Sequence, residues 1–231
     1  MKTRPIIFQP WKAEWLHNLP LDYEAQTRRV VKCSNSFVNG HRCDKKYWGG
    51  LNLSRSGSNH GTYLQTLLRH SDDPSGENRI YKVCPRWQVG DRLWVRESFH
   101  FNKEVNYFPP SMVHSKNEVW YEGPLLILDS KKPDHKGKLR SPIHMPRWAS
   151  RTLLEITAVK VERIQDISEK DARAEGAEHW DITTQCTDPK FYERRTTRAA
   201  YSDLWDKING KKHPWAANDL VWVYTVRRVK E

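Results

Sequence analysis

The chain has 231 residues, of which 37% are apolar, and a mean hydropathy of −0.85. No apolar run approaches the roughly 18 residues that cross a bilayer, and the apolar stretch near the start is cut short by Pro10, so that we expect no signal peptide. We therefore expect one cytoplasmic domain over residues 1–231, whose net charge of +11 indicates either a polyanionic partner such as RNA or a solvated basic surface.

The first elements are short. Residues 6–8 form an apolar run that ends before Pro10 and predict a strand, and residues 11–19 predict a short helix. Residues 51–62 and 70–79 are rich in Ser, Gly, Asn and Asp, which is typical of loops.

The middle of the chain predicts three strands, at residues 91–97, 119–121 and 151–164. The last of these changes phase, because its apolar residues before Thr157 and after Ala158 have opposite parity. A β-bulge near these two residues would return all of them to one face, as bulges do where strands of a barrel bend.

Two helices and a final strand follow. Ser168 and Gly176 bound a helix at 169–175, and apolar residues at three- and four-residue spacing predict a second helix at 191–208. The strand at 220–229 has apolar residues on both faces, which favours a central position. Short strands with two main helices predict an α+β fold, a small and partly open barrel with flanking helices.

The four cysteines, Cys33, Cys43, Cys84 and Cys186, have no close pairs, so no disulfide framework is expected. Cys33, Cys43 and Cys84 with His41 could in principle converge on zinc, but the chain has no CxxC pair to form such a site. Four ordinary thiols are the simpler interpretation.

Glu175 is a candidate general acid or base. It is expected in the last helical turn, where the carbonyl dipoles repel a carboxylate, and Asp171 lies one turn earlier. Both effects would raise the pKa of Glu175 in a dry site. An exposed Glu on a short charged helix fits the same sequence.

The segment Gln26-Thr27-Arg28-Arg29 is a candidate phosphate or carboxylate clamp, because it sets a hydroxyl beside two guanidinium groups. A basic patch at a strand edge or helix end is the alternative. Further cations with neighbouring aromatic residues occur at Arg92, Trp94, Arg96, Arg147 and Trp148.

Six blocks of the sequence then form a recognisable series: QTRRV at 26–30, VGDRLWVRE at 89–97, SPIHMPRWASR at 141–151, LEITAVKVERIQDISEKDARAEG at 154–176, YSDLWDKING at 201–210 and DLVWVYTVRRV at 219–229. Together they resemble the ASCH-domain family, and most closely its long phage- and prophage-type members. ASCH domains are similar to PUA domains, which are small β-barrels with helices. The resemblance implies this fold, insertions at about 31–83 and 98–140, and RNA or a modified nucleoside as ligand.

One ASCH branch hydrolyses acetylcytidine, using a Lys and a Thr of a GRKTxT segment and a Glu near the end of the following short helix. Matched position by position, the Thr falls on Thr27, the Glu on Glu175 and the Lys on Glu24. Glu24 cannot stabilise an oxyanion as a Lys would. Lys12 and Lys32 are other lysines that could reach such a site.

Glu24 and Glu175 together would instead form a two-carboxylate site that holds a divalent ion or positions water for phosphodiester cleavage. Ribonucleases are reported among ASCH proteins. The candidate catalytic residues are therefore Thr27, Glu24 and Glu175, in an amidohydrolase or a ribonuclease.

Two readings without catalysis remain open. In the first, the domain binds RNA or a modified base, with arginines lining a cleft and a tryptophan stacking on the base; the residues are Gln26, Arg28, Arg29, Arg92, Trp94, Arg96, Arg147 and Trp148. In the second, a phage protein binds a host protein through its insertions, which carry the aromatic pairs Tyr47-Trp48 and Tyr107-Phe108.

Overall fold

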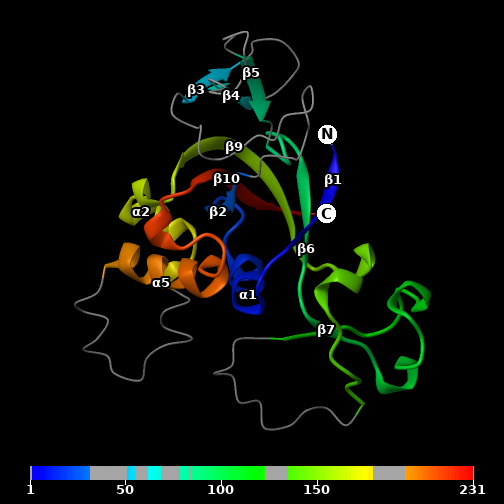
Figure 1. Ribbon diagram of the computed structural model, residues 1–231. Helices are drawn as coiled ribbons and strands as arrows, with labels where there is room; N and C mark the ends of the chain where they lie inside the picture. Colours follow the sequence, from blue (N-terminus) through cyan, green and yellow to red (C-terminus); the bar gives the residue numbers. More distant parts are fainter. Residues whose placement is uncertain are drawn as a thin grey trace.

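A five-stranded sheet is the largest element of the structure, a computed structural model that describes residues 2–31, 51–55, 62–68, 79–83, 85–122, 135–178 and 196–230 (Figure 1). Its strands are β1 (Thr3–Ile7), β6 (Arg92–Arg96), β9 (Leu153–Arg163), β10 (Leu220–Val229) and β2 (Glu24–Val30), in that spatial order. β1 pairs parallel to β6, and the other neighbours are antiparallel. The edges of this sheet are therefore β1 and β2, which carry much of the site described below.

The predicted bulge in β9 is confirmed. The pairing of β9 with β10 skips Thr157, so that Ala158 and Ile156 lie opposite consecutive residues of β10. Leu154, Ile156, Val159 and Val161 consequently contribute to the same apolar cluster. The bulge thus keeps these apolar side chains on one face of the strand, buried from Leu154 to Val159 and half-buried at Val161.

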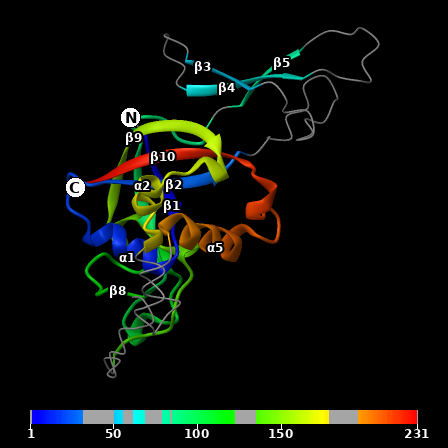
Figure 2. The ribbon, with the colours of Figure 1, turned by 90° about the vertical axis from the view of Figure 1, so that its left-hand side faces the viewer.

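β10 lies inside the sheet, as predicted, and separates two apolar clusters. Trp222, Tyr224 and Val226 face the cluster that includes one side of helix α1 (Pro10–Asn18). Val221 and Val223 face the cluster formed by helices α2 (Glu169–Ala174) and α5 (Thr197–Asn209). Figures 1 and 2 show β9 and β10 arching over these helices.

The helices begin and end close to where the sequence predicts. The Ser168 hydroxyl accepts a hydrogen bond from Asp171 N at 3.0 Å and caps α2, and the Thr196 hydroxyl caps α5 in the same way. Residues 191–195 of the second predicted helix lie outside the described residues. None of the described helices is long and apolar enough to cross a membrane.

The two predicted insertions contain regular elements of their own. In the first, β3 (Leu51–Arg55), β4 (Thr62–Leu68) and β5 (Arg79–Val83) form an antiparallel sheet. In the second, β7 (Phe99–His100) pairs with β8 (Trp120–Tyr121). Short 3-10 helices complete the described elements: Lys103–Val105, Pro110–Met112, Pro142–His144, Arg147–Ala149, Ile164–Asp166 and Trp215–Ala217.

The α+β class is correct, but the described strands form an open sheet and no closed barrel. The predicted strand at 6–8 is also displaced, since β1 is Thr3–Ile7. The proposed zinc ligands Cys33, His41, Cys43 and Cys84, together with Cys186, lie outside the described residues, as do Tyr47 and Trp48.

Candidate functional site

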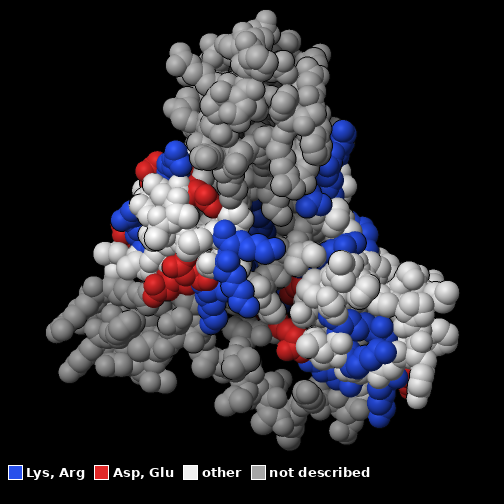
Figure 3. All heavy atoms as spheres, viewed as in Figure 1, with Lys and Arg blue, Asp and Glu red and all other residues white. Residues whose placement is uncertain are grey.

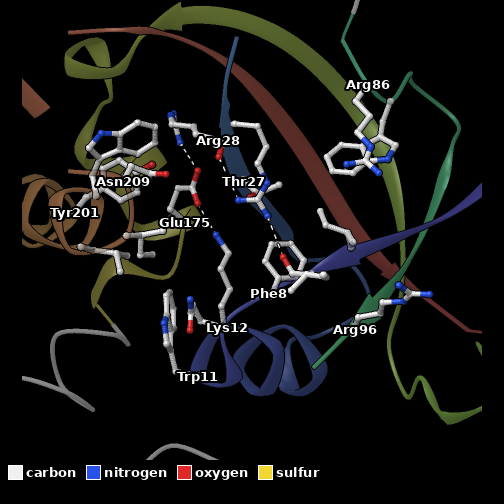
Figure 4. Close-up of a pocket in the computed structure, with 18 of the residues that line it drawn as sticks. Phe8, Trp11, Lys12, Thr27, Arg28, Arg86, Arg96, Glu175, Tyr201 and Asn209 are labelled. Atoms are coloured by element: carbon white, nitrogen blue, oxygen red, sulfur yellow. Dashed lines mark hydrogen bonds and ion pairs between the residues drawn. The ribbon is translucent and has the colours of Figure 1, made fainter. Parts of the chain in front are cut away.

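A cavity of about 380 Å³ opens between the two edge strands of the large sheet (Figure 4). The end of β1, the middle of β2, the first turn of α1, the end of α2 and one face of α5 all contribute to its wall. Lys and Arg side chains gather at the centre of the corresponding molecular face (Figure 3). A volume of this size is at the lower end of the range for small-molecule sites.

Glu175 lies in the wall of this cavity between two cations. One carboxylate oxygen accepts a hydrogen bond from Lys12 Nζ, and the other accepts one from Arg28 Nη1 at 3.1 Å. All three residues are buried, with relative exposures of 7% or less. Lys12 also donates to the backbone oxygen of Gln26 at 3.0 Å, which holds its amine beside the residue that follows, Thr27.

The end of α2 fixes the position of Glu175. Its backbone N–H donates to Asp171 O at 3.0 Å, and the next residue, Gly176, has a φ of +79° that ends the helix. A Cβ atom on Gly176 would lie 3.0 Å from the ring of Trp15 in α1. The close approach of α1 to this turn thus requires glycine and also brings Lys12 to Glu175.

Arg28 is held by several carboxylates. Its Nε and Nη2 donate to Glu162 of β9 at 2.9 and 2.7 Å, and Asp171 lies 3.7 Å from Nη2. The side chain is completely buried. Arg28 therefore anchors Glu175 to the sheet, and its charge is matched by acidic groups already present.

Thr27 lines the cavity from β2 and is only 1% exposed. Within the described part of the chain its hydroxyl has no hydrogen-bond partner. Figure 4 shows Lys12 and Glu175 meeting in the cavity, with Thr27 on the neighbouring strand β2. The hydroxyl is thus available to a ligand.

Burial lowers the pKa of Lys12 below its ordinary value of 10.5, and the neighbouring Glu175 carboxylate offsets only part of this effect. The positive charges of Arg29 and Arg28 lower the pKa of Lys12 further. Lys12 also lies in the first turn of α1, where the helix dipole disfavours a positive charge. The amine therefore loses its proton more readily than an exposed lysine does.

Aromatic rings form much of the remaining wall. Those of the described residues are Phe8, Trp11, Trp87, Tyr201 and Trp205, all less than 9% exposed. Flat rings of this kind are suitable surfaces for a planar heterocycle. The indole N–H of Trp87 is buried without a partner among the described residues.

Five of the residues predicted from sequence meet at this cavity: Thr27, Arg28, Arg29, Arg96 and Glu175. Glu24 does not. It starts β2, is exposed, and accepts a hydrogen bond from Thr157 Oγ1 at 3.0 Å. Thr27 is three residues further along the strand, about 10 Å away and on the opposite face. The predicted pairing of Glu24 with Glu175 is therefore not formed.

Other predicted ligand-binding residues also lie elsewhere. The side chain of Gln26 donates to Asp171 at 2.8 Å and does not line the cavity, and neither does Arg92. Trp94 is covered by Arg96 and Arg147, whose guanidinium carbons lie 4.4 and 5.9 Å from its ring.

Trp148 stacks on Phe101 at 5.5 Å within the small cluster beside β7 and β8. The two tryptophans proposed to stack on a base are therefore already packed against protein groups. The aromatic wall of the cavity comes from other residues.

Lys12 is one of the two lysines named from the sequence as able to reach the site, but no role of its own was predicted for it. It reaches Glu175 across 163 residues of chain, and only the packing of α1 against α2 brings the two together. No local pattern in the sequence indicates this contact.

Comparison with known protein families, with characterised proteins and with solved structures finds no match to this chain. The resemblance to ASCH domains accordingly stays a prediction. No cluster of three or more His, Cys, Asp or Glu side chains suited to a metal ion occurs among the residues that the structure describes.

Proposed function

We propose that the protein binds a modified nucleoside in this cavity and hydrolyses an acyl amide on its base. The observation that carries the proposal is the contact of Lys12 with Glu175 in a cavity whose wall also contains Thr27, a residue whose hydroxyl has no hydrogen-bond partner among the described residues. Lys, Thr and Glu are the residue types that the ASCH resemblance implies for acetylcytidine hydrolysis. Here the lysine comes from α1, while the position matched in the sequence holds Glu24.

The chemistry follows from the environment of each group. Lys12, whose pKa is lowered by burial, takes the proton of the Thr27 hydroxyl as its oxygen attacks the amide carbonyl. The same proton passes to the exocyclic nitrogen as the C–N bond breaks, which releases the nucleoside with its free amino group. Water then cleaves the acyl-threonine ester and yields the carboxylic acid. Glu175 orients Lys12, and Arg28 fixes Glu175.

Acetylcytidine is the first substrate to test. Wild type should release cytidine and acetate, and Thr27→Val should lower the rate at least about 100-fold because the nucleophile is removed. Glu175→Gln should also slow the reaction, since Lys12 loses the carboxylate that positions it. Chromatography of the nucleosides measures the product directly. Undiminished hydrolysis by both variants would exclude this site.

Arg163→Gln is a suitable control for the purification and for the loss of one charge. Arg163 is exposed at the end of β9 and donates to Asn218 O at 3.2 Å, outside the cavity. This variant should hydrolyse acetylcytidine at the wild-type rate. Hydrolysis by a contaminating host enzyme would be equal in every preparation, including that of the Thr27→Val variant.

A binding role without hydrolysis is the second candidate function. The aromatic wall favours it, because flat rings can hold a base. Arg29 favours it as well: its guanidinium carbon lies 5.3 Å from the centre of the Phe8 ring, and it forms no ion pair with a carboxylate among the described residues. Retained binding of a modified nucleoside or RNA with no product would support it. Binding that is insensitive to salt would argue against phosphate contacts in this cavity.

The other two readings have less support. Ribonuclease action through Glu24 and Glu175 requires two carboxylates in one site, and these residues do not meet. A host-protein interface on the second insertion would use Tyr107 and Phe108, which are 95% and 53% exposed. That exposure fits such an interface, but does not identify a partner.

A further inference from the structure

The cavity wall has a large excess of positive charge. Among the described residues that line it, the cations are Lys12, Arg28, Arg29, Arg86 and Arg96, and Glu175 is the acidic one. Lys12 and Arg28 are paired with Glu175, and Arg28 additionally with Glu162 and Asp171. The other three arginines form no ion pair with a carboxylate of the residues that the structure describes.

These three arginines come from separate parts of the chain. Arg29 is on edge strand β2, Arg96 ends β6, and Arg86 lies in the segment before β6. None has a carboxylate within ion-pair distance in the part of the chain that the structure describes. Figure 4 shows Arg86 and Arg96 on the far side of the cavity from Glu175. The wall therefore has two chemically different sides.

Each of the three guanidinium groups is supported by an aromatic ring. Arg29 lies over Phe8 at 5.3 Å, Arg96 over Trp94 at 4.4 Å, and Arg86 over Trp87 at 5.2 Å. Stacking of this kind holds the planar group in place while its edge stays free to donate.

Few of their donors are used within the protein. Arg29 donates to two backbone oxygens at 3.3 and 3.4 Å, and Arg96 donates to Ile143 O at 3.0 Å. An arginine has five N–H donors, so most remain. Burial lowers the pKa of Arg29, a cost that a bound anion would offset.

We infer that the ligand is a nucleotide, with its phosphate held by Arg29, Arg86 and Arg96 while its base lies against Lys12, Thr27 and Glu175. The identity of the base rests on the proposed function, whereas the phosphate site rests on the charges of the wall. Among the described residues, an uncharged nucleoside would leave the three arginines of the cavity wall without an anion. A phosphate monoester accepts several hydrogen bonds from such groups and balances the charge.

Calorimetric titration tests this directly. Cytidine 5′-monophosphate should bind at least about tenfold more tightly than cytidine at low salt, as expected for hydrogen bonds between charged groups. The difference should shrink as salt is added. Equal affinities of the two compounds would overturn the inference.

Two variants locate the phosphate. Arg86→Gln and Arg29→Gln should each remove most of the preference for the monophosphate, while their affinity for cytidine stays within about twofold. Arg86 is exposed, so its replacement does not endanger folding if the variant of the half-buried Arg29 proves unstable. Arg163→Gln is the matched control and should keep the full preference. An unchanged preference in both cavity variants would place the phosphate elsewhere and contradict the inference.

Binding and hydrolysis of three compounds separate this inference from the proposed function. The compounds are the acetylated nucleoside, its 5′-monophosphate and a short RNA with a 5′-terminal acetylcytidine. Hydrolysis of all three at one rate, with no phosphate preference in binding, leaves the function standing and overturns the phosphate site. Arg86-dependent binding of the monophosphate without hydrolysis keeps the phosphate site and removes the chemistry. Tighter Arg86-dependent binding of the RNA identifies a chain end as the source of the phosphate.

Discussion

Two buried glutamates, Glu97 and Glu175, differ in how they use their oxygens. Both oxygens of Glu97 accept from a single guanidinium, that of Arg151, at 2.9 and 2.8 Å, and Arg151 also binds Glu14 at 2.6 Å. Glu175 divides its oxygens between Arg28 and Lys12 and lines the cavity. Glu97 is not part of that wall.

The difference teaches that burial alone does not identify a functional carboxylate. A bidentate contact with arginine uses the whole Glu97 carboxylate in joining β6 to the segment before β9. Glu175 instead holds an amine with a lowered pKa at the edge of an open space. The first arrangement stabilises the fold, and the second also offers a group able to exchange a proton.

Replacing Glu97 should give the largest loss of stability. Glu97→Ala leaves Arg151 with Glu14 alone and should lower the free energy of unfolding by about 3–5 kcal/mol. Hydrolysis per folded molecule should not change. Urea denaturation measures the free energy of unfolding. Hydrolysis rates divided by the concentration of folded protein measure the second effect. A loss of less than about 1 kcal/mol would contradict the structural role of this pair.

The pH dependence of hydrolysis should follow the ionisation of the Lys12 amine. Burial lowers the pKa of Lys12 below the ordinary lysine value of 10.5. The neutral amine, which is the form that accepts a proton, therefore forms at a lower pH than in an exposed lysine. The value of kcat/KM should rise about tenfold per pH unit below that pKa and level off above it. Rates from pH 6 to 10 test this, and a rate that falls across the same range would show that Lys12 acts in its charged form.

Gly176→Ala should have a smaller effect on stability. The residue has a φ of +79°, and its new Cβ would press on the Trp15 ring, so we expect a loss of at least about 1 kcal/mol. Since the preceding residue is Glu175, hydrolysis should slow as well. Thermal denaturation and kinetics on one sample check both, and a neutral substitution would mean that this turn does not position Glu175.

Glu24→Gln should change almost nothing. The residue is exposed, and the one hydrogen bond of its side chain within the described residues is with Thr157. The free energy of unfolding should therefore change by less than about 0.5 kcal/mol. Its rate of hydrolysis should equal that of the wild type. Substantial loss of activity would instead favour the two-carboxylate site predicted from sequence.

Local patterns were sufficient for much of the fold. The phase change in β9, the Ser168 cap and the apolar spacing in α5 each have a direct physical cause, and the structure confirms them. The strands of the first insertion were missed because Ser-, Gly- and Asn-rich segments around β3 and β5 are typical of loops.

The site was predicted in part. Thr27 and Glu175 do meet at one cavity, but Glu24 was assigned to it although residues three apart in a strand lie on opposite faces. Lys12 could not be placed, because its contact with Glu175 depends on how α1 packs against the end of α2. Long-range packing of this kind leaves no local pattern in the sequence.

The most direct test of the account is acetylcytidine hydrolysis by the wild type and by Lys12→Met, purified in the same way. Methionine preserves most of the volume of lysine and removes the amine that contacts Glu175. The account predicts repeated turnover to cytidine by the wild type and a rate at least about 100-fold lower for the variant. No cytidine from the wild type, or equal rates for the two proteins, would contradict it.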